Sequence, residues 1–228
     1  MATQLENSMQ MTTAKIAHEM KNPLAIIRAN IQLLELEDKD NEHKRNYNVM
    51  YAEIDRINRL ILEFIEVSKP KEYQFKKIEI KAIFHEILQD IDAELKFKAI
   101  VLICNISNED MFVWADRAKI KEVFVNMIKN ASEAVEKGGK IYITIFKSDN
   151  YINVKIEDNG KGIPEEYIDY IGKPFFTTKK GGSGLGVSIS KKIIEDHEGT
   201  FSIASVEGEG SSISILLPQY EQKNQSFS

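Results

Sequence analysis

A histidine within a helical pattern is the first group in the chain whose surroundings suit group transfer. His18 stands in the stretch His-Glu-Met-Lys-Asn-Pro, two residues beyond the apolar position Ile16. Two residues correspond to about 200° around a helix, so His18 faces away from the side that Ile16 buries. A neutral imidazole is nucleophilic, and the carboxylate of Glu19 could hold its second nitrogen protonated. Asn22 shares the face of His18 one turn later. Taken alone, the stretch also fits an ordinary solvated histidine.

Two asparagines one helical turn apart form a second polar feature. Asn126 and Asn130 lie in the segment Glu-Val-Phe-Val-Asn-Met-Ile-Lys-Asn-Ala, where a separation of four residues places them on one face. Magnesium prefers oxygen ligands and keeps several waters, so an amide oxygen here could bind the ion together with phosphate oxygens. Paired asparagines alone are also common at helix surfaces.

Glycines that follow a strand-like run suit an anion site. Asp158 begins Asp-Asn-Gly-Lys-Gly-Ile, and a wider stretch, Gly-Gly-Ser-Gly-Leu-Gly, ends where a helix is expected to begin. Backbone amides without side chains at a helix N-terminus can bind phosphates, and Asp158 could accept a hydrogen bond from an adenine amino group. The residues assigned to this nucleotide site are Asp158, Gly160, Gly162, Ile163, Gly182, Ser183, Gly184, Leu185 and Gly186.

The spacing of these glycines and their neighbours also bears on other kinds of site. A tight turn between strands also explains Asp-Asn-Gly taken alone. A calcium loop is disfavoured because the alternating carboxylates and the terminal glutamate are missing. A Rossmann or Walker site is disfavoured because neither its glycine spacing nor a final Gly-Lys-Ser/Thr is present.

Two helices are expected in the N-terminal part of the chain, and the first of them carries His18. Apolar residues recur at helical spacings between residues 12 and 36, and the charged stretch 37–45 interrupts them. A second series steps alternately by three and four, the heptad period of a supercoiled seam. The two series are Ile16, Met20, Ile27, Ile31 and Leu34, then Tyr47, Met50, Ile54, Ile57, Ile61 and Phe64. One hairpin buries little surface, so two copies are expected to form a four-helix bundle in a homodimer. The alternative is an antiparallel hairpin packed on its own C-terminal domain.

The proline in Ser-Lys-Pro-Lys, residues 68–71, ends the second helix and marks a domain boundary. Helical patterns at 80–97, 116–135 and 185–196 then alternate with strand-like runs at 100–106, 111–114, 141–146, 151–157, 200–206 and 212–217. This order predicts an α+β protein in which an α/β sandwich, with helices on one face of a mixed sheet, follows the hairpin. The expected domains are residues 1–70 and 71–220, followed by a disordered tail at 221–228.

Composition narrows the class of protein. A chain of 228 residues with 43% hydrophobic residues can bury one large core or two small ones. The net charge of -5 argues against a nucleic-acid binder, which usually carries a basic excess. Cys104, the single cysteine, lies in an apolar run and is expected to be an inert core residue in a reducing cytoplasmic setting. No window approaches the roughly 20 apolar residues of a membrane span, although a longer parent could be anchored through an upstream sensor region.

In their order along the chain, the motifs resemble the sensor histidine kinase family. The histidine motif, the paired asparagines, Asp-x-Gly-x-Gly, Pro-Phe-Phe-Thr-Thr-Lys at 174–179 and Gly-Ser-Gly-Leu-Gly follow one another as the family's H, N, G1, F and G2 boxes do. The resemblance covers about residues 12–218. Among members of the family, the sporulation kinases of spore-forming Gram-positive bacteria are most similar in two segments, His-Glu-Met-Lys-Asn-Pro-Leu and Asn-Ala-Ser-Glu-Ala.

The resemblance implies a role for each motif. It implies that His18 accepts the γ-phosphoryl group of ATP, that Asn130 binds Mg²⁺ and that Asp158 recognises adenine. The lid over the phosphates would comprise Thr178, Lys179 and the loop 182–186, with Phe175 and Phe176 as its hinge or latch.

The implied fold is a dimeric hairpin followed by the ATP-binding sandwich shared with gyrase, Hsp90 and mismatch-repair ATPases. Those ATPases typically have a water-activating glutamate at the position of Asn126. An amide cannot act as a general base, which favours transfer to histidine over hydrolysis. Ser183 departs from the usual threonine but keeps its hydroxyl. The competing interpretations are a plain ATPase of the same superfamily and a dimeric pseudokinase scaffold, although no nucleotide motif is visibly broken.

The resemblance also implies partners. The receiver domain of a response regulator would take the phosphoryl group on an aspartate, in a sporulation phosphorelay if the narrower similarity holds. Small protein inhibitors of the kinase are a further class of partner. The receiver must dock on the face of His18, which the helix shares with Ile26, Ala29, Asn30 and Leu33 within about 120°. Packing against the second helix is the alternative role of these four residues.

Overall fold

The computed structural model describes residues 22–38, 43–68, 72–179 and 182–220, which form two compact units. The chain divides between Glu72 and Tyr73, and the segment Thr178–Leu185 groups with the first unit. His18 and Glu19, and the tail predicted at 221–228, lie outside the described residues. Within those ranges no helix is long and apolar enough to cross a membrane.

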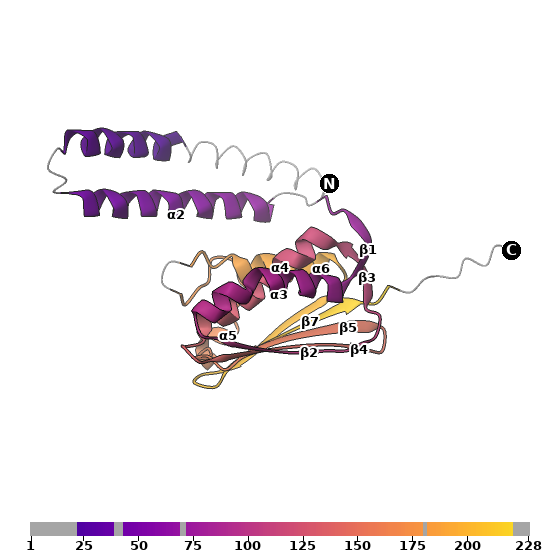
Figure 1. Ribbon diagram of the computed structural model, residues 1–228. Helices are drawn as coiled ribbons and strands as arrows, with labels where there is room; N and C mark the ends of the chain where they lie inside the picture. The colour runs from indigo at the N-terminus through magenta and orange to yellow at the C-terminus, as the bar shows by residue number, and fades with distance from the viewer. Residues whose placement is uncertain (1–21, 39–42, 69–71, 180–181, 221–228) are drawn as a thin grey trace. The chain divides into compact units, whose positions relative to one another are not determined.

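The first unit contains a helical hairpin (Figure 1). Its first helix is described over residues 22–37, and α2 follows at Lys44–Ser68. Across the pair, the Arg28 guanidinium lies 2.6 Å from the Asp55 carboxylate and 5.3 Å from the centre of the Tyr51 ring. The buried residues between the helices are Leu24, Ile31, Tyr47, Ile54 and Ile61. The heptad spacing along the second helix therefore predicted the packing of the hairpin correctly, although not every seam residue.

Three residues predicted to lie in the seam face solvent instead. Ile27, Leu34 and Met50 are exposed by 50%, 52% and 46%, whereas Leu24, which the predicted seam omitted, is buried. An apolar stripe with helical spacing can be wider than the strip that one partner helix covers. The hairpin consequently carries apolar surface outside its own core.

The second unit is a mixed sheet of five strands with α3, α4 and α6 on one face (Figure 1). The strand order is β2-β4-β5-β7-β6, with β2 and β4 parallel and the other neighbours antiparallel. A separate pair joins β1 (Phe75–Glu79) to β3 (Phe112–Asp116). The strands of the main sheet are Val101–Ile106 (β2), Lys140–Ser148 (β4), Tyr151–Asp158 (β5), Thr200–Val206 (β6) and Gly210–Pro218 (β7). The helices are Ile80–Phe97 (α3), Arg117–Ala134 (α4), Glu165–Ile168 (α5) and Gly186–Asp196 (α6).

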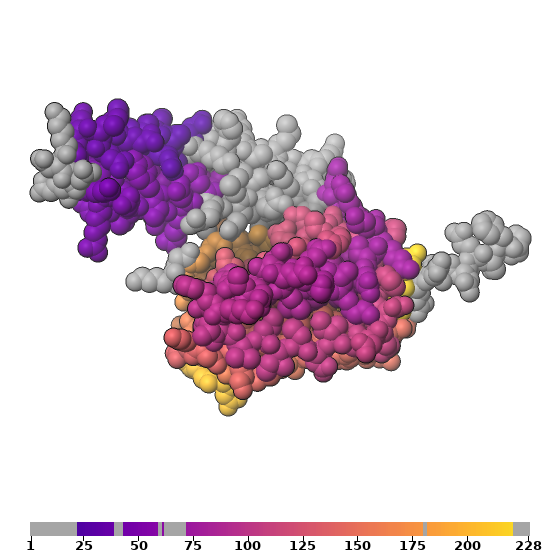
Figure 2. Space-filling view, in the orientation of Figure 1, coloured from indigo at the N-terminus to yellow at the C-terminus, as the bar shows by residue number. Residues whose placement is uncertain are grey.

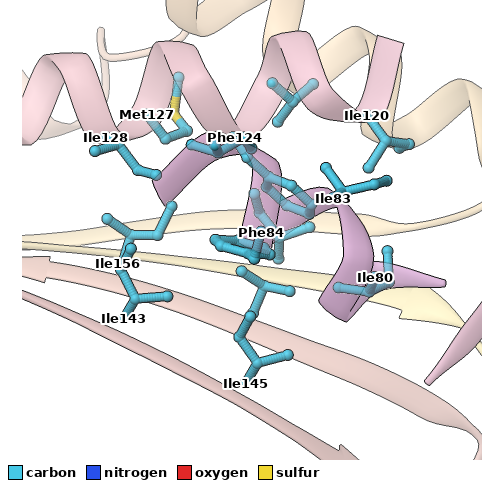
Figure 3. Close-up of a cluster of buried hydrophobic side chains, with 14 of the residues drawn as sticks. Ile80, Ile83, Phe84, Ile120, Phe124, Met127, Ile128, Ile143, Ile145 and Ile156 are labelled. Atoms are coloured by element: carbon cyan, nitrogen blue, oxygen red, sulfur yellow. The ribbon is translucent and has the colours of Figure 1, made fainter. Parts of the chain in front are cut away.

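Alternation along the central strands builds the core of this unit. Ile143 and Ile145 of β4 and Ile156 of β5 are buried and point toward the helices (Figure 3). Phe84 of α3 and Phe124 of α4 meet them with ring centroids 4.5 Å apart. Side chains close the space between the helices and the sheet that the ribbon leaves open (Figure 2). The predicted α+β fold, a helical hairpin followed by a mixed sheet with helices on one face, is confirmed.

Two elements and one side chain differ from the sequence analysis. Strand β1 and the short helix α5 were not predicted, because β1 has few buried residues and α5 is a single turn. Cys104 was expected in the core, but it is exposed on β2, an edge strand of the sheet. The apolar run that contains it lies on an edge strand whose residues are half-buried or exposed. Desolvation nevertheless raises the pKa of the Cys104 thiol, which disfavours the nucleophilic thiolate at neutral pH.

The N-terminus of α4 is fixed by a polar cluster around Asp116. The Asp116 carboxylate caps the helix by accepting hydrogen bonds from the Ala118 and Lys119 backbone N–H groups, and it also accepts one from Gln74. The Asp116 N–H donates to Nε2 of the buried His197, 3.0 Å away, and Nδ1 of His197 lies 2.7 Å from the Ile193 carbonyl oxygen. Both ring nitrogens of His197 thus have backbone partners, one at the end of β3 and one on α6.

The Asp116 cap gives the unit a pH-dependent contribution to stability. Burial alone would raise the pKa of Asp116, but the three backbone N–H groups outweigh it and hold this pKa below its usual range. A carboxyl group whose pKa is lowered by folding stabilises the fold above its unfolded pKa, about 3.9, and loses that contribution as the pH falls through its folded pKa.

Replacing this cap should destabilise the protein only where the carboxylate is ionised. Asp116→Ala is expected to lower the free energy of unfolding by about 1–2 kcal/mol at pH 7, and the difference from wild type should shrink below about pH 4. Urea unfolding at pH 7 and pH 3 measures both values. Asp110→Ala, at an exposed aspartate, is the control and should change little. An equal loss at both pH values would show that the charge on Asp116 is not what stabilises the helix.

Candidate nucleotide-binding site

Helix α4 carries the two predicted asparagines. Its buried face, which includes Val123, Phe124 and Met127, packs into the core and leaves Asn126 and Asn130 half-buried on its flank. The Asn126 amide nitrogen donates to the hydroxyl of Ser190 on α6 at 3.0 Å. The amide of Asn126 is thus oriented by a second helix.

The start of α6 lies against the same amide. A Cβ atom placed on Gly186 would be 3.0 Å from both the oxygen and the nitrogen of the Asn126 side chain, closer than most real Cβ contacts. Glycine at this position therefore lets the first turn of α6 approach α4 closely. This use of Gly186 brings together two motifs that are about sixty residues apart in the sequence.

Asp158 ends strand β5 and is half-buried. Its Oδ1 accepts a hydrogen bond of 2.9 Å from the Gly160 N–H. That bond holds the carboxylate against the turn that follows the strand, the local geometry expected of an Asp-x-Gly turn.

The glycines after Asp158 allow backbone to pass close to backbone. A Cβ on Gly160 would lie 2.5 Å from the Ala134 carbonyl oxygen at the end of α4. Gly162 has a φ of +63°, and a Cβ there would lie 1.9 Å from the carbonyl oxygen of Val206. Lys161 sits between them, donating its N–H to Ala134 and accepting from the Gly208 N–H. Neither Gly160 nor Gly162, both assigned above to the nucleotide site, leaves room for a Cβ atom, and this close packing fixes the segment between α4 and the β6–β7 turn.

Ile163 follows this segment and is half-buried. Downstream, Phe176 packs against two tyrosines, with ring centroids 5.8 Å from Tyr167 and 5.5 Å from Tyr170. Neither tyrosine was among the predicted site residues, although their spacing of three residues from each other was a usable signal. Phe175 has a φ of +68° and is exposed. The two phenylalanines predicted to form a hinge therefore differ, one being anchored and the other exposed.

The remaining predicted nucleotide residues fall in the segment Thr178–Leu185, which is described apart from the sheet unit. Within it, the Leu185 N–H donates to the Ser183 hydroxyl at 3.3 Å, and Gly184 has a φ of +73°. The Gly182 N–H donates to the carbonyl of Lys179 at 3.1 Å, and Thr178 is exposed. The segment thus has turn geometry of its own, with a positive φ that favours glycine at 184.

On the hairpin, the residues assigned to the face of His18 are accessible. Asn22, Ala29 and Asn30 are exposed, and the Asn30 amide donates to the Ile26 carbonyl. Ile26 and Leu33 are 63% and 59% exposed. Packing against α2 within the hairpin therefore does not account for these two apolar residues.

A cavity of about 610 Å³ lies elsewhere in the sheet unit. It is lined by residues of β1, β3, the β4–β5 turn, the end of α6 and the chain after β7. None of its lining residues is one of those predicted to bind ATP. The predicted ATP-binding residues and this cavity therefore lie at different places in the sheet unit.

Comparison with known proteins identifies the family. Residues 8–72 match the family described as His Kinase A (phospho-acceptor) domain, and residues 115–221 match the family described as Histidine kinase-, DNA gyrase B-, and HSP90-like ATPase. The chain is 36% identical to the signal transduction histidine-protein kinase AtoS of Escherichia coli (strain K12), over 93% of this chain and 35% of AtoS. It is 33% identical to sporulation kinase C of Bacillus subtilis (strain 168), over 90% of this chain and 48% of that kinase.

Solved structures of histidine kinases are also similar to this chain. The catalytic domain of histidine kinase ThkA is 35% identical, with a TM-score of 0.59 over 64% of this chain and 96% of that domain. ThkA in complex with the response regulator protein TrrA is 31% identical, with a TM-score of 0.70 over 94% of this chain and 63% of that chain. The chain belongs to the sensor histidine kinases and carries their phospho-acceptor and ATPase-like domains. It spans about a third to a half of the length of the curated relatives it matches.

The packing role of Gly162 can be separated from its positive φ. Gly162→Ala should lower the free energy of unfolding by about 3 kcal/mol or more, because it adds a backbone clash to an unfavourable φ. Gly208→Ala is a matched control with a φ of +81° and open space around its Cβ, so it should cost only about 1–2 kcal/mol. Urea unfolding of both variants measures the difference. Equal costs would refute the proposed close contact with Val206.

Proposed function

We propose that this chain is an ATP-dependent protein histidine kinase that phosphorylates itself on His18 and passes the phosphoryl group to an aspartate of a response-regulator receiver domain. The observation that carries the proposal is the presence of both matched domains in one chain. The phospho-acceptor match covers His18, and the ATPase-like match covers Asn126, Asp158 and Gly186. One chain thus contains both the domain that would bind ATP, the phosphoryl donor, and the domain that holds the acceptor histidine.

In the proposed site, Asp158 accepts the adenine amino group and Asn130 supplies an oxygen to Mg²⁺. The donor set fits this ion, because magnesium is usually held by one or two protein oxygens together with substrate phosphates and waters. Among the described residues no group of three or more His, Cys, Asp or Glu side chains forms a metal cage of its own. When bound, the ion neutralises charge on the phosphates. The other residues proposed to contact ATP are Gly160, Gly162, Ile163, Phe176, Thr178, Lys179, Gly182, Ser183, Gly184, Leu185 and Gly186.

The transfer step uses a ring nitrogen of His18. That nitrogen attacks the γ-phosphorus, the bond from this phosphorus to the bridging oxygen breaks, and ADP leaves. The carboxylate of Glu19 holds the other ring nitrogen protonated and offsets the positive charge that develops on the imidazole. Asn126 has no basic atom with which to activate water, so hydrolysis does not compete through this residue. Asn22, exposed one turn after His18, is proposed to orient water when the kinase acts as a phosphatase on its partner.

The proposed partners follow from exposed surfaces of the hairpin. Ile27, Leu34 and Met50 are proposed to pack against a second copy of the hairpin in a homodimer. Ile26, Ala29, Asn30 and Leu33 are proposed to receive the receiver domain, which the ThkA–TrrA complex supports as a class of partner. Small protein inhibitors would be further partners of the hairpin, and nucleic acid is not proposed.

The finer biological role depends on the whole protein. Similarity to several sporulation kinases of Bacillus subtilis supports a place in a sporulation phosphorelay, whereas AtoS and ZraS, at comparable identities, support other two-component systems. We place the chain in the cytoplasmic part of a longer parent, because the matched relatives are much longer than this chain. An upstream sensor region that anchors this parent to a membrane is part of the same proposal.

The acceptor residue can be tested directly. His18→Gln should abolish phosphorylation of the chain by ATP with Mg²⁺ while leaving ATP affinity unchanged, because donor and acceptor groups lie in different matched domains. The wild-type label should be acid-labile and alkali-stable, as a phosphorus–nitrogen bond is. His43→Gln, at an exposed histidine of the same hairpin, is the control and should keep full labelling. Labelling that survives in His18→Gln, or a joint loss of ATP binding, would contradict the assignment.

The docking face is tested by separating transfer from autophosphorylation. Ile26→Glu combined with Ala29→Arg should slow phosphoryl transfer to the cognate receiver at least about tenfold, as expected for loss of a packed apolar contact worth more than about 1.4 kcal/mol. Autophosphorylation of His18 should stay near the wild-type rate. Phe97→Glu, at a residue of α3 that is 91% exposed, controls for the loss of exposed apolar surface. Unchanged transfer, or equal loss of both activities, would overturn this placement of the receiver.

A further inference from the structure

The amide of Asn126 is held on two sides by one helix. Gly186 and Ser190 are four residues apart on α6 and therefore share a face. Gly186 brings the helix backbone to the amide, and the Ser190 hydroxyl receives the hydrogen bond from its nitrogen. Ser190 is only 2% exposed, so water does not compete for this bond.

The hydrogen bond to Ser190 uses the amide nitrogen of Asn126 and leaves the amide oxygen for a ligand. A carboxamide is planar, and its one carbon carries both a donor nitrogen and an acceptor oxygen. With its nitrogen bonded to Ser190, the amide keeps its oxygen beside Gly186 in the first turn of α6, where no Cβ atom covers it. In the reverse orientation the nitrogen would be presented, and a nitrogen that carries two hydrogens cannot bind a cation.

We propose that Ser190 is a positioning residue for nucleotide binding, which fixes the amide of Asn126 so that its oxygen faces the Mg²⁺–phosphate end of bound ATP. The proposal rests on the proposed function and extends it by one residue, since Ser190 lies outside the motifs that define the site. Ser190 does not touch the nucleotide; it acts through Asn126. Because Ser190 lies on α6 and Asn126 on α4, Mg²⁺-dependent binding of ATP also depends on how these two helices pack against each other.

Loss of the Ser190 hydroxyl leaves the Asn126 nitrogen without its buried acceptor. The amide is then no longer fixed and can present either atom. Binding that depends on the metal should weaken, whereas binding of ATP without metal should not. A hydroxyl at this position is the required feature, so threonine should restore what alanine removes if the buried site accepts one more methyl group.

The test compares ATP affinity with and without Mg²⁺, by titration calorimetry on the full chain. Ser190→Ala should weaken binding of ATP in the presence of Mg²⁺ by about five- to tenfold, the effect of losing one buried hydrogen bond, and should leave binding in EDTA within about twofold of wild type. Ser190→Thr should bind nearly as wild type under both conditions.

The matched control is Ser132→Ala. Ser132 is a buried serine of α4 that bonds to the Lys129 carbonyl rather than to Asn126, so its loss should leave both affinities unchanged. Equal affinities for wild type and Ser190→Ala, a loss that is the same in EDTA, or the same loss in Ser132→Ala would overturn the proposal. If Ser190→Ala fails to fold, Ser190→Cys replaces it, because the thiol keeps the volume with a much weaker acceptor, and the same criteria apply.

Failure of the proposed function gives a different result. Wild-type protein that binds ATP with a Mg²⁺-dependent gain but never labels His18 would refute the kinase assignment while leaving the role of Ser190 to be judged by the titrations. Wild-type protein that binds no ATP would overturn both.

Discussion

The contact on which the proposed nucleotide site depends is one of backbone against backbone. After β5 the chain passes between the last turn of α4 and the β6–β7 turn, and at Gly162 it leaves no room for a Cβ atom beside the Val206 carbonyl. This passage fixes where β5 ends, and therefore where the Asp158 carboxylate lies. It also ties the C-terminal end of α4 to the sheet through the bonds of Lys161. Glycine is required there by geometry, and the site is built on that requirement.

Helix α4 is the scaffold that joins this passage to the rest of the unit. Its buried face packs on the sheet, Asp116 and His197 hold its first turn, and the Asn126–Ser190 bond connects its middle to α6. Each end of the helix and its centre are thus fixed by a different part of the chain. A ligand that contacts α4 meets a surface whose side chains are already oriented, which lowers the entropic cost of binding.

Much of this architecture could be predicted, because the spacing of apolar residues along a strand or helix indicates which of its faces is buried. The alternating isoleucines of β4 and β5 and the apolar face of α4 lie where their spacing placed them, and the order of elements gave the mixed sheet with its helices on one face. Edge and surface features were predicted less well. Cys104 lies in an apolar run that edge strand β2 leaves exposed, and Ile27 belongs to a stripe wider than one helix can cover.

The site was predictable in its residue types but not in all of its contacts. Motif order singled out Asn126, Asp158 and the glycines, because each motif is local in sequence. The contacts of Gly162 with Val206 and of Asn126 with Ser190 join segments that are more than forty residues apart, and local spacing carries no information about them. For the same reason the sequence assigned Gly160 and Gly162 to the nucleotide site but could not predict their close packing.

The central claim is that ATP binds beside Asp158 and α4 rather than in the cavity of the same unit that Trp114, Tyr151 and Tyr220 line. A crystal structure of the full chain with Mg²⁺ and a non-hydrolysable ATP analogue tests it most directly. The account predicts the adenine amino group within hydrogen-bonding distance of the Asp158 carboxylate and the metal at the Asn130 amide oxygen. Nucleotide bound instead among Trp114, Tyr151 and Tyr220 in the cavity of about 610 Å³ would contradict it.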